Sequence, residues 1–358
     1  MKKNKNRRKV AFIGTSYLFC HQAVRDFILS GQLEDTDIYL YDIAPDPLKV
    51  EYELICRMIE QGESDITVRK CRSRREAIRD ADYVIVSVLA GGLDTVDKED
   101  KICRKHGIRH TVGDTIGPMS AARCLRQVPL LLDIARDMEK YCPGAPMLSP
   151  TNPMAVLTTA VNRYTDVDCI GICHGTHFAM QIIANSYGTD IKNVEVNVVG
   201  VNHLAFVNRV WVRGKEKKIE QVIKKSTSEA LKGYEDPAGH VDKADCAIQF
   251  ASRTGYFPNN GDHHFIEFFP WFLAPHAFKR GRNTYGLNSR LLNIPKRKKR
   301  KKDLKKLLHD WTWKLDRIPD MDKYGSEHIN DIILALEGRK KDMHMTNLHL
   351  NVVNGKSV

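Results

Sequence analysis

The chain has 358 residues, of which 42% are hydrophobic and 28% charged, a composition ordinary for a soluble globular protein. No apolar run approaches the roughly 20 residues that a membrane-spanning helix needs, so the sequence argues against an integral membrane protein. The length exceeds the size at which one hydrophobic core usually stops growing, and we expect two domains or one domain with a large insertion.

The net charge of +12 comes largely from two segments, a basic tail at residues 1–8 and a run of Lys and Arg at 296–302. The run carries no aromatic residues on which bases would stack, and such runs are typical of solvated loops. We therefore predict neither a nucleic-acid nor a membrane partner, although the positive field would attract anionic substrates. The tail leads into a short strand-like segment rather than the long apolar region of a secretion signal, which indicates a cytoplasmic protein.

Residues 9 to about 150 alternate short apolar runs with helical patterns, which predicts repeated βαβ units and a parallel sheet. We expect strands at 10–13, 38–41, 83–88 and 146–149, and helices at 20–29, 47–61 and 121–141. A β-branched run at 167–172 extends the pattern. The predicted fold class is α/β, with a Rossmann-like domain at 9–193.

From residue 194 the pattern changes. Strands are expected at 194–199 and 206–213, followed by helices and irregular stretches rich in Gly, Pro and Asn. We predict that residues 194–358 form an α+β domain that carries the metal and substrate. Near its end, residues 346–355 have the pattern of a strand entering a turn.

Cys173 and His203 are the first candidates for a metal site. Each follows a β-branched run, and we expect each run to be a parallel strand that ends at the ligand-binding edge of an α/β sheet. One thiol and one imidazole cannot complete a structural zinc site, so a metal held by them would keep open positions, as a catalytic metal does. The alternative is a buried free cysteine and a core histidine. The nine cysteines have no disulfide-framework spacing, so we expect reduced thiols.

A dinucleotide site is predicted at the turn after the first strand. Gly14 opens this turn and Asp42 ends the second strand, the places where a dinucleotide meets a helix N-terminus and an acid that binds ribose. The turn has one glycine where the G-x-G-x-x-G motif has three, but Thr15 and Ser16 can present N–H groups and hydroxyls to phosphate. Gly91 follows a later strand and would allow close approach to the cofactor. The alternative is an ordinary βα turn.

Several motifs then occur in an informative order. They are Phe-Ile-Gly at 12–14, Asp-Tyr-Val-Ile at 82–85, Gly-Gly-Leu at 91–93, Gly-Asp-Thr-Ile-Gly-Pro at 113–118, Thr-Asn-Pro at 151–153, Gly-Ile-Cys-His-Gly at 171–175, Gly-Val-Asn-His-Leu at 200–204 and Gly-Asp-His-His-Phe-Ile-Glu-Phe-Phe-Pro-Trp-Phe at 261–272. Together they resemble glycoside hydrolase family 4, the NAD- and manganese-dependent glycosidases related in fold to lactate and malate dehydrogenases. This family is an exception to the usual pair of catalytic carboxylates.

The resemblance implies a reaction that passes through oxidation of the sugar. Bound NAD takes a hydride from C3, the ketone makes the C2 proton acidic, and the group at C1 is eliminated. Water addition and return of the hydride complete the cycle. Mn or another divalent metal holds the C2 and C3 oxygens and stabilises the enolate.

The resemblance also assigns roles to matched positions. Cys173 and His203 correspond to the family's metal ligands. Asn152 corresponds to an Asn-Pro turn beside substrate and nicotinamide. Asn202 neighbours the metal-binding histidine and is a candidate substrate residue.

Three residues are candidates for proton transfer. His174 matches the position of the general acid, Asp114 is a second candidate acid or base, and Tyr256 is the nearest match to the tyrosine base at C2. The alternative roles are a loop histidine, a helix N-cap and a packing aromatic.

The substrate expected from the resemblance is an α-linked uronic acid, a glucuronide or galacturonide. The Cys-His-Gly and Gly-Asp-His-His motifs resemble the branch that acts on such substrates, and a carboxylate would bind to nearby cationic side chains. The candidates are His177, Arg253, His263 and His264. An α-glucosidase or α-galactosidase of the same family is the alternative.

Two rival functions remain open at this point. A malate- or lactate-type dehydrogenase would consume NAD and need no metal thiolate. A catalytically degenerate homologue would agree with the single glycine of the turn and with a C-terminus that is short for the family. We expect the enzyme to be a homodimer or homotetramer.

Overall fold

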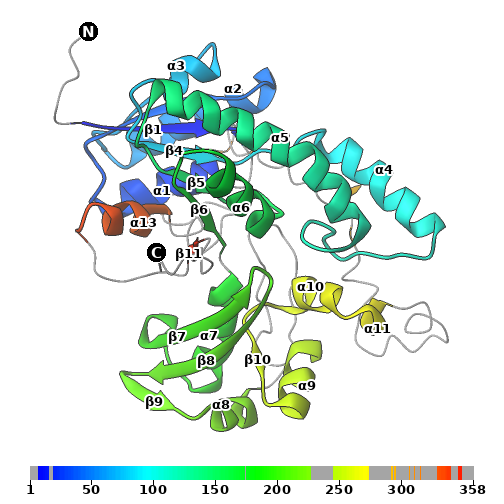
Figure 1. The fold of residues 1–358 in the computed structure, drawn as a ribbon. Coiled ribbons are helices and arrows are strands. Elements are labelled where there is room, and N and C mark those ends of the chain that lie inside the picture. The colour runs from blue at the N-terminus through cyan, green and yellow to red at the C-terminus, as the bar shows by residue number, and fades with distance from the viewer. Residues whose placement is uncertain are drawn as a thin grey trace. The chain divides into compact units, whose positions relative to one another are not determined.

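The computed structural model describes residues 7–15, 19–173, 175–226, 245–273 and 329–339, with short pieces at 292, 294–295, 306, 310, 315 and 346–348. The chain forms two compact units that alternate along the sequence. The first contains residues 1–90, 124–172 and 295–358, and the second contains residues 91–123 and 173–294. Each unit has its own sheet (Figure 1).

The first unit is built on a seven-stranded sheet in the order β11-β6-β5-β4-β1-β2-β3. Neighbouring strands are parallel except that β11 runs antiparallel to β6. The strands are β1 (Arg8–Ile13), β2 (Thr36–Tyr41), β3 (Thr67–Lys70), β4 (Tyr83–Val86), β5 (Met147–Ser149), β6 (Cys169–Ile172) and β11 (Thr346–Leu348). The predicted Rossmann-like parallel sheet is confirmed.

Helices cover both faces of this sheet, because successive strand residues point to opposite sides. In β1, Val10 and Phe12 belong to one core cluster, whereas Ala11 and Ile13 belong to the other. The first cluster includes residues of α1 (Cys20–Ser30), α2 (Pro45–Gln61) and α13 (Ile329–Leu336), and the second includes residues of α3 (Arg74–Ile78), α5 (Gly117–Tyr141) and α6 (Met154–Tyr164). The helices predicted at 20–29, 47–61 and 121–141 are confirmed within four residues at each end.

The second unit contains an antiparallel sheet in the order β10-β8-β7, with β9 paired to β8. Its elements are α4 (Gly92–Lys105), α7 (Gly175–Ser186), η1 (Ile191–Asn193), β7 (Val194–Val201), β8 (Leu204–Val212), β9 (Lys215–Lys217), α8 (Ile219–Lys225), α9 (Asp245–Thr254), β10 (Phe257–Pro258), α10 (Asp262–Phe265), η3 (Ile266–Phe268) and α11 (Pro270–Leu273). Phe178 and Ile182 of α7 share a core cluster with Val207 and Val210 of β8. This helix therefore anchors the sheet.

One expectation about this sheet is wrong. The strand before His203 was expected to be parallel, but β7 and β8 form an antiparallel hairpin in which Val201 pairs with Leu204. Only Asn202 and His203 connect the two strands. A two-residue connection joins antiparallel strands, whereas a parallel crossover needs a dozen residues or more.

The compact units differ from the continuous domains expected at 9–193 and 194–358. The reason is that α13 supplies residues to the core of the first unit and β11 pairs with β6 in its sheet.

The basic run at 296–302 lies outside the described residues. Among those residues, no helix has both the length and the apolar character needed to cross a membrane.

Candidate active site

His203 lies in an uncommon backbone conformation at the tip of the β7–β8 hairpin. Its φ is +66°, and it is 2% exposed. The other described non-glycine residues with positive φ, namely Glu63, Asp80 and Arg213, are all exposed. Positive φ costs free energy for a residue with a Cβ, and such conformations cluster at functional sites. The hairpin therefore holds this imidazole in a fixed, buried orientation.

Cys173 and His203 meet at the distance expected for two ligands of one ion. Cys173 Sγ lies 3.5 Å from His203 Nε2. Ligand bonds of about 2.3 Å to sulfur and about 2.1 Å to nitrogen at a tetrahedral angle separate the two ligand atoms by about 3.6 Å. The thiolate and imidazole donors thus fit a divalent metal, and the N–H of Gly175 also points at the sulfur, at 3.4 Å.

Thr115 fixes the tautomer of His203. Thr115 Oγ1 lies 2.6 Å from His203 Nδ1 and 2.9 Å from Asp114 Oδ1. The hydroxyl has a single proton, which it donates to the Asp114 carboxylate, so it accepts the proton of Nδ1–H. The lone pair of His203 is then on Nε2, the atom that faces Cys173. Metal-binding histidines are commonly oriented in this way by a partner at the second ring nitrogen.

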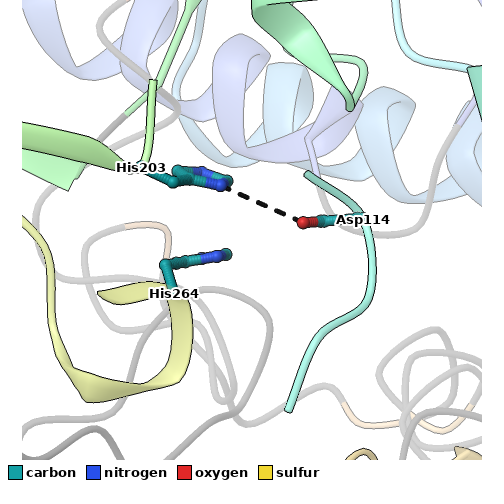
Figure 2. Close-up of side chains that lie close together, drawn as sticks. All are labelled: Asp114, His203 and His264. Atoms are coloured by element: carbon teal, nitrogen blue, oxygen red, sulfur yellow. Dashed lines mark ion pairs between the residues drawn. The ribbon is translucent and has the colours of Figure 1, made fainter. Parts of the chain in front are cut away.

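Asp114 and His264 complete a cluster of ligand-type side chains. The imidazole of His264 stacks on that of His203, with centroids 3.7 Å apart and planes 25° apart. One ligand atom from each of Asp114, His203 and His264 lies within 4.8 Å of the others. Figure 2 shows these side chains directed toward one another from the hairpin, α10 and the loop before α5. Asp114, a candidate acid or base, and His264, a candidate substrate residue, therefore lie beside the candidate metal ligands.

Arg123 and Asn202 are two further buried polar residues near this cluster. Arg123 of α5 is 5% exposed, and its Nη1 lies 3.9 Å from Asp114 Oδ2, so it partly offsets the carboxylate charge. Asn202 is 6% exposed, and its amide nitrogen has no hydrogen-bond partner among the described residues. A buried donor of this kind suits a ligand oxygen, and the substrate role of Asn202 stays a prediction.

Replacing Thr115 with valine is expected to weaken metal binding by about 10- to 100-fold, because His203 loses the acceptor that fixes its tautomer. Thr115→Ser keeps the hydroxyl and should stay within about threefold of the unmodified protein. The measurement is a Co²⁺ titration followed by the sulfur-to-cobalt charge-transfer absorption. Equal affinities of the valine and serine variants would show that the hydroxyl does not orient the imidazole.

The predicted dinucleotide turn lies in the first unit. Gly14 has φ of +82°, and a Cβ on it would lie 2.2 Å from the carbonyl oxygen of Ser87. Asp42 Oδ2 accepts hydrogen bonds from the N–H and hydroxyl of Thr15, at 2.8 and 3.2 Å, and Oδ1 accepts from the N–H of Ala44 at 2.8 Å. The carboxylate thus lies beside the turn after β1, and its role in binding ribose stays a prediction. Ser16 lies outside the described residues.

Asn152 belongs to the first unit and Gly91 to the second. The Asn152–Pro153 peptide is cis, and Thr151 donates a hydrogen bond to the carbonyl of Val86 at the end of β4. Asn152 therefore follows a turn attached to the carboxyl end of the sheet. Gly91 precedes α4 with φ of +81°. The cofactor roles of both residues stay predictions.

Comparison with known sequences decides the family. Residues 9–189 match the pattern described as family 4 glycosyl hydrolase, and residues 198–357 match that of the family 4 glycosyl hydrolase C-terminal domain. The chain belongs to the family 4 glycosyl hydrolases. This result confirms the resemblance found in the sequence motifs.

Relatives of this family 4 chain carry several substrate names. It is 31% identical over 268 residues to an alpha-galactosidase of Bacillus subtilis, covering 74% of this chain and 60% of the relative. It is 29% identical over 279 residues to an alpha-galacturonidase of Thermoanaerobacter italicus, again covering 74% of this chain and 60% of the relative. The chain therefore matches about three fifths of the length of each of these relatives.

Solved structures share the fold of this family 4 chain. A 6-phospho-alpha-glucosidase from gut microorganisms, solved with NAD and Mn²⁺, has a TM-score of 0.75 at 16% identity, covering 95% of this chain and 77% of that one. A 6-phospho-beta-glucosidase from Thermotoga maritima, solved with manganese, NAD⁺ and glucose-6-phosphate, has a TM-score of 0.72 at 20% identity, covering 96% and 76%. At these identities the similarity establishes the fold.

Four other residues were predicted for the site, namely His174, Tyr256, His177 and Arg253. His174, the candidate general acid, lies outside the described residues. Tyr256, the candidate base, is 63% exposed and packs edge-on against Phe206. His177 lies half-buried on α7, and Arg253 is exposed on α9. Their catalytic and substrate roles stay predictions.

His263 has a defined structural contact. Its side chain is buried, and its carbonyl oxygen accepts a hydrogen bond from the hydroxyl of Thr111.

Thr115 and Glu267 were not predicted as site residues, although both lie inside motifs that carry the family resemblance. Two features of the sequence could have indicated them: Thr115 directly follows the candidate acid Asp114, and Glu267 is a carboxylate within an aromatic segment.

Proposed function

We propose that this chain is a glycosidase that cleaves α-linked uronic acids by redox elimination with bound NAD and a divalent metal. The observation that carries the proposal is the 3.5 Å separation of Cys173 Sγ and His203 Nε2, with the His203 lone pair assigned to Nε2. A malate- or lactate-type dehydrogenase needs no metal held by a thiol and an imidazole, so the pairing of these two ligand types favours the glycosidase. Cys173 and His203 are the residues that would hold the metal.

The two cofactors supply the chemistry that side chains lack. When bound, NAD accepts a hydride from the sugar ring, and the metal polarises sugar oxygens as a Lewis acid. Gly14, Thr15, Asp42 and Asn152 of the first unit are the described residues proposed to bind the dinucleotide, and the cofactor role of Gly91 stays a prediction from the sequence. Their contribution is to approach phosphate with backbone N–H groups and to hold ribose hydroxyls.

The side chains near the metal ligands would orient the sugar and move protons. Asp114 is buried, accepts from the Thr115 hydroxyl and lies 4.0 Å from His203 Nδ1, so the metal-site histidine and this acid share a rigid hydrogen-bonded unit. Asn202 presents a buried amide donor from the same hairpin. We propose His174 as general acid and Tyr256 as the base at C2, on the strength of the motif match.

The preference for a uronide rests on the histidine side chains of the Gly-Asp-His-His segment, which can donate hydrogen bonds to a carboxylate. His264 stacks on His203 and is therefore placed to meet a carboxylate on a sugar held at that site. His263, His177 and Arg253 are the other candidates. An α-galactosidase is the second candidate function, because the B. subtilis relative at 31% identity carries that name.

The test is hydrolysis of aryl α-galacturonide, α-glucuronide and α-galactoside by the reduced protein. We expect turnover of the uronides to require both NAD and Mn²⁺ and to fall to background, at least about 1,000-fold, when either is removed. Deuterium at C2 or C3 of the sugar should slow the reaction. Hydrolysis that persists without NAD and metal contradicts the proposal, and stoichiometric accumulation of NADH favours a dehydrogenase. Faster turnover of the galactoside selects the second candidate.

A further inference from the structure

Glu267 makes an unusual set of contacts in the second unit. Its Oε1 accepts hydrogen bonds from three consecutive main-chain N–H groups, those of Thr111, Val112 and Gly113, at 2.8, 2.8 and 2.9 Å. Successive N–H groups that converge in this way form a concave anion site. Here the anion is the protein's own side chain, contributed by η3.

The segment held by Glu267 leads directly to the side chains that orient His203. Asp114 follows Gly113, and Thr115 follows Asp114. The described residues 109–116 contain no helix or strand, so local hydrogen bonds rather than a regular element fix their position. The Thr111 hydroxyl adds a second attachment by donating to the carbonyl of His263.

This arrangement leaves little opportunity for water to replace the carboxylate. Thr111 and Val112 are buried, as is Gly113, and Glu267 itself is 8% exposed. If the acceptor oxygen were removed, three buried N–H groups would lose their partner, and the segment would have to move to recover hydrogen bonds. Such a movement would carry Thr115 away from His203 Nδ1.

We infer that Glu267 is a positioning residue of the candidate metal centre, which sets the orientation of His203 through the main chain of residues 111–113 and the Thr115 hydroxyl. This inference rests on the proposed function. Glu267 touches neither Cys173 nor His203 in any described contact, so it acts through the segment that it holds. The role explains why a carboxylate is buried within an aromatic stretch.

The acceptor oxygen and the charge of Glu267 can be separated by substitution. Burial raises the pKa of Glu267 to about 7, the N–H donors of residues 111–113 oppose this shift, and the nearby Asp114 carboxylate adds to it. Glu267→Gln keeps an oxygen at the same reach without the charge. Glu267→Met keeps the length of the side chain without the oxygen, and Glu267→Asp keeps the charge but withdraws the oxygen by one methylene.

Asp262 offers a matched control on the same segment. Its carboxylate is also buried and accepts two main-chain N–H bonds, from Cys246 and Ala247 at 3.0 and 2.9 Å. These bonds hold the start of α9 rather than residues 111–113. Asp262→Asn therefore disturbs a comparable buried carboxylate without releasing the segment before Asp114.

The experiment is titration of the full chain with Co²⁺, followed by the sulfur-to-cobalt charge-transfer absorption that reports coordination by the Cys173 thiolate. We expect the Kd for Co²⁺ to rise about 10- to 100-fold in Glu267→Met, as for loss of an orienting partner. Glu267→Gln and Asp262→Asn should stay within about threefold of the unmodified protein. Glu267→Asp should lose at least about fivefold and serves as the deciding variant if Glu267→Met does not fold.

Two results would overturn the inference and are distinguishable. If the unmodified protein binds Co²⁺ with the thiolate band and Glu267→Met or Glu267→Asp binds it equally well, Glu267 has no positioning role and the proposed function stands. If the unmodified protein shows no thiolate band at saturating Co²⁺, the proposed metal centre is wrong and the inference about Glu267 fails with it.

Discussion

Replacing Cys173 with serine or His203 with asparagine is expected to lower kcat/KM for an aryl α-uronide by at least about 1,000-fold, equivalent to about 4 kcal/mol of transition-state stabilisation. The reason is that Cys173 Sγ and His203 Nε2, 3.5 Å apart, are placed to hold one ion. Steady-state kinetics with NAD and Mn²⁺ measures the effect. Both variants should keep the folded far-UV spectrum, because the changes remove ligand atoms rather than core volume.

A double variant sharpens this prediction. If the two side chains hold the same ion, Cys173→Ser combined with His203→Asn should cost little more than either change alone, since residues that act as a unit are strongly non-additive. Cys56→Ser, which changes a partly exposed thiol on α2, is the control and should leave activity unaltered. A loss of less than tenfold in Cys173→Ser would instead identify the 3.5 Å contact as a simple S–H···N hydrogen bond.

Replacing Gly14 with alanine is expected to destabilise the first unit by about 2–5 kcal/mol, the sum of a left-handed backbone penalty and overpacking. The new Cβ would lie 2.2 Å from the main-chain carbonyl oxygen of Ser87. A backbone atom cannot move aside as the end of a flexible side chain can, so either the end of β1 or the loop that follows β4 must shift. Urea-induced unfolding, with NAD affinity measured in parallel, gives the size of the effect.

Gly31→Ala provides the comparison for this second prediction. Gly31 ends α1 with φ of +62°, and no heavy atom lies within 4 Å of the position that an added methyl group would take. Its replacement should cost only about 1 kcal/mol, from the backbone conformation alone. If both variants are destabilised equally, close approach at the predicted dinucleotide turn does not explain the glycine at position 14.

The sequence predicted the central strands of the first sheet well, because β1 and β4 are buried on both faces. β1 and β4 contain continuous apolar runs, whereas the apolar residues of an amphipathic helix recur every three or four positions. β3 was not predicted, because it is a mostly exposed edge strand, Thr67–Lys70, without an apolar repeat. β7 was expected to pair in parallel and this was wrong, because a β-branched run indicates a strand but not whether its neighbour runs parallel or antiparallel to it.

In the candidate site too, some residues could be predicted from the sequence and others could not. Cys173 and His203 are chemically distinctive, and the motif order was sufficient to pair them before their distance was known. Thr115 and Glu267 act through hydrogen bonds between segments that are 88 and 154 to 156 residues apart. Hydroxyls and carboxylates are common on any surface, so only the three-dimensional arrangement identifies these two as neighbours of the site.

The alternation of the two units along the chain has a consequence for biosynthesis. Ile329, Ile332 and Ile333 of α13 pack in the same core cluster as Phe27 and Leu54, which lie some three hundred positions earlier. Translation delivers residues 173–294 before this helix leaves the ribosome. The apolar core of the first unit therefore cannot be completed until α13 has been synthesised.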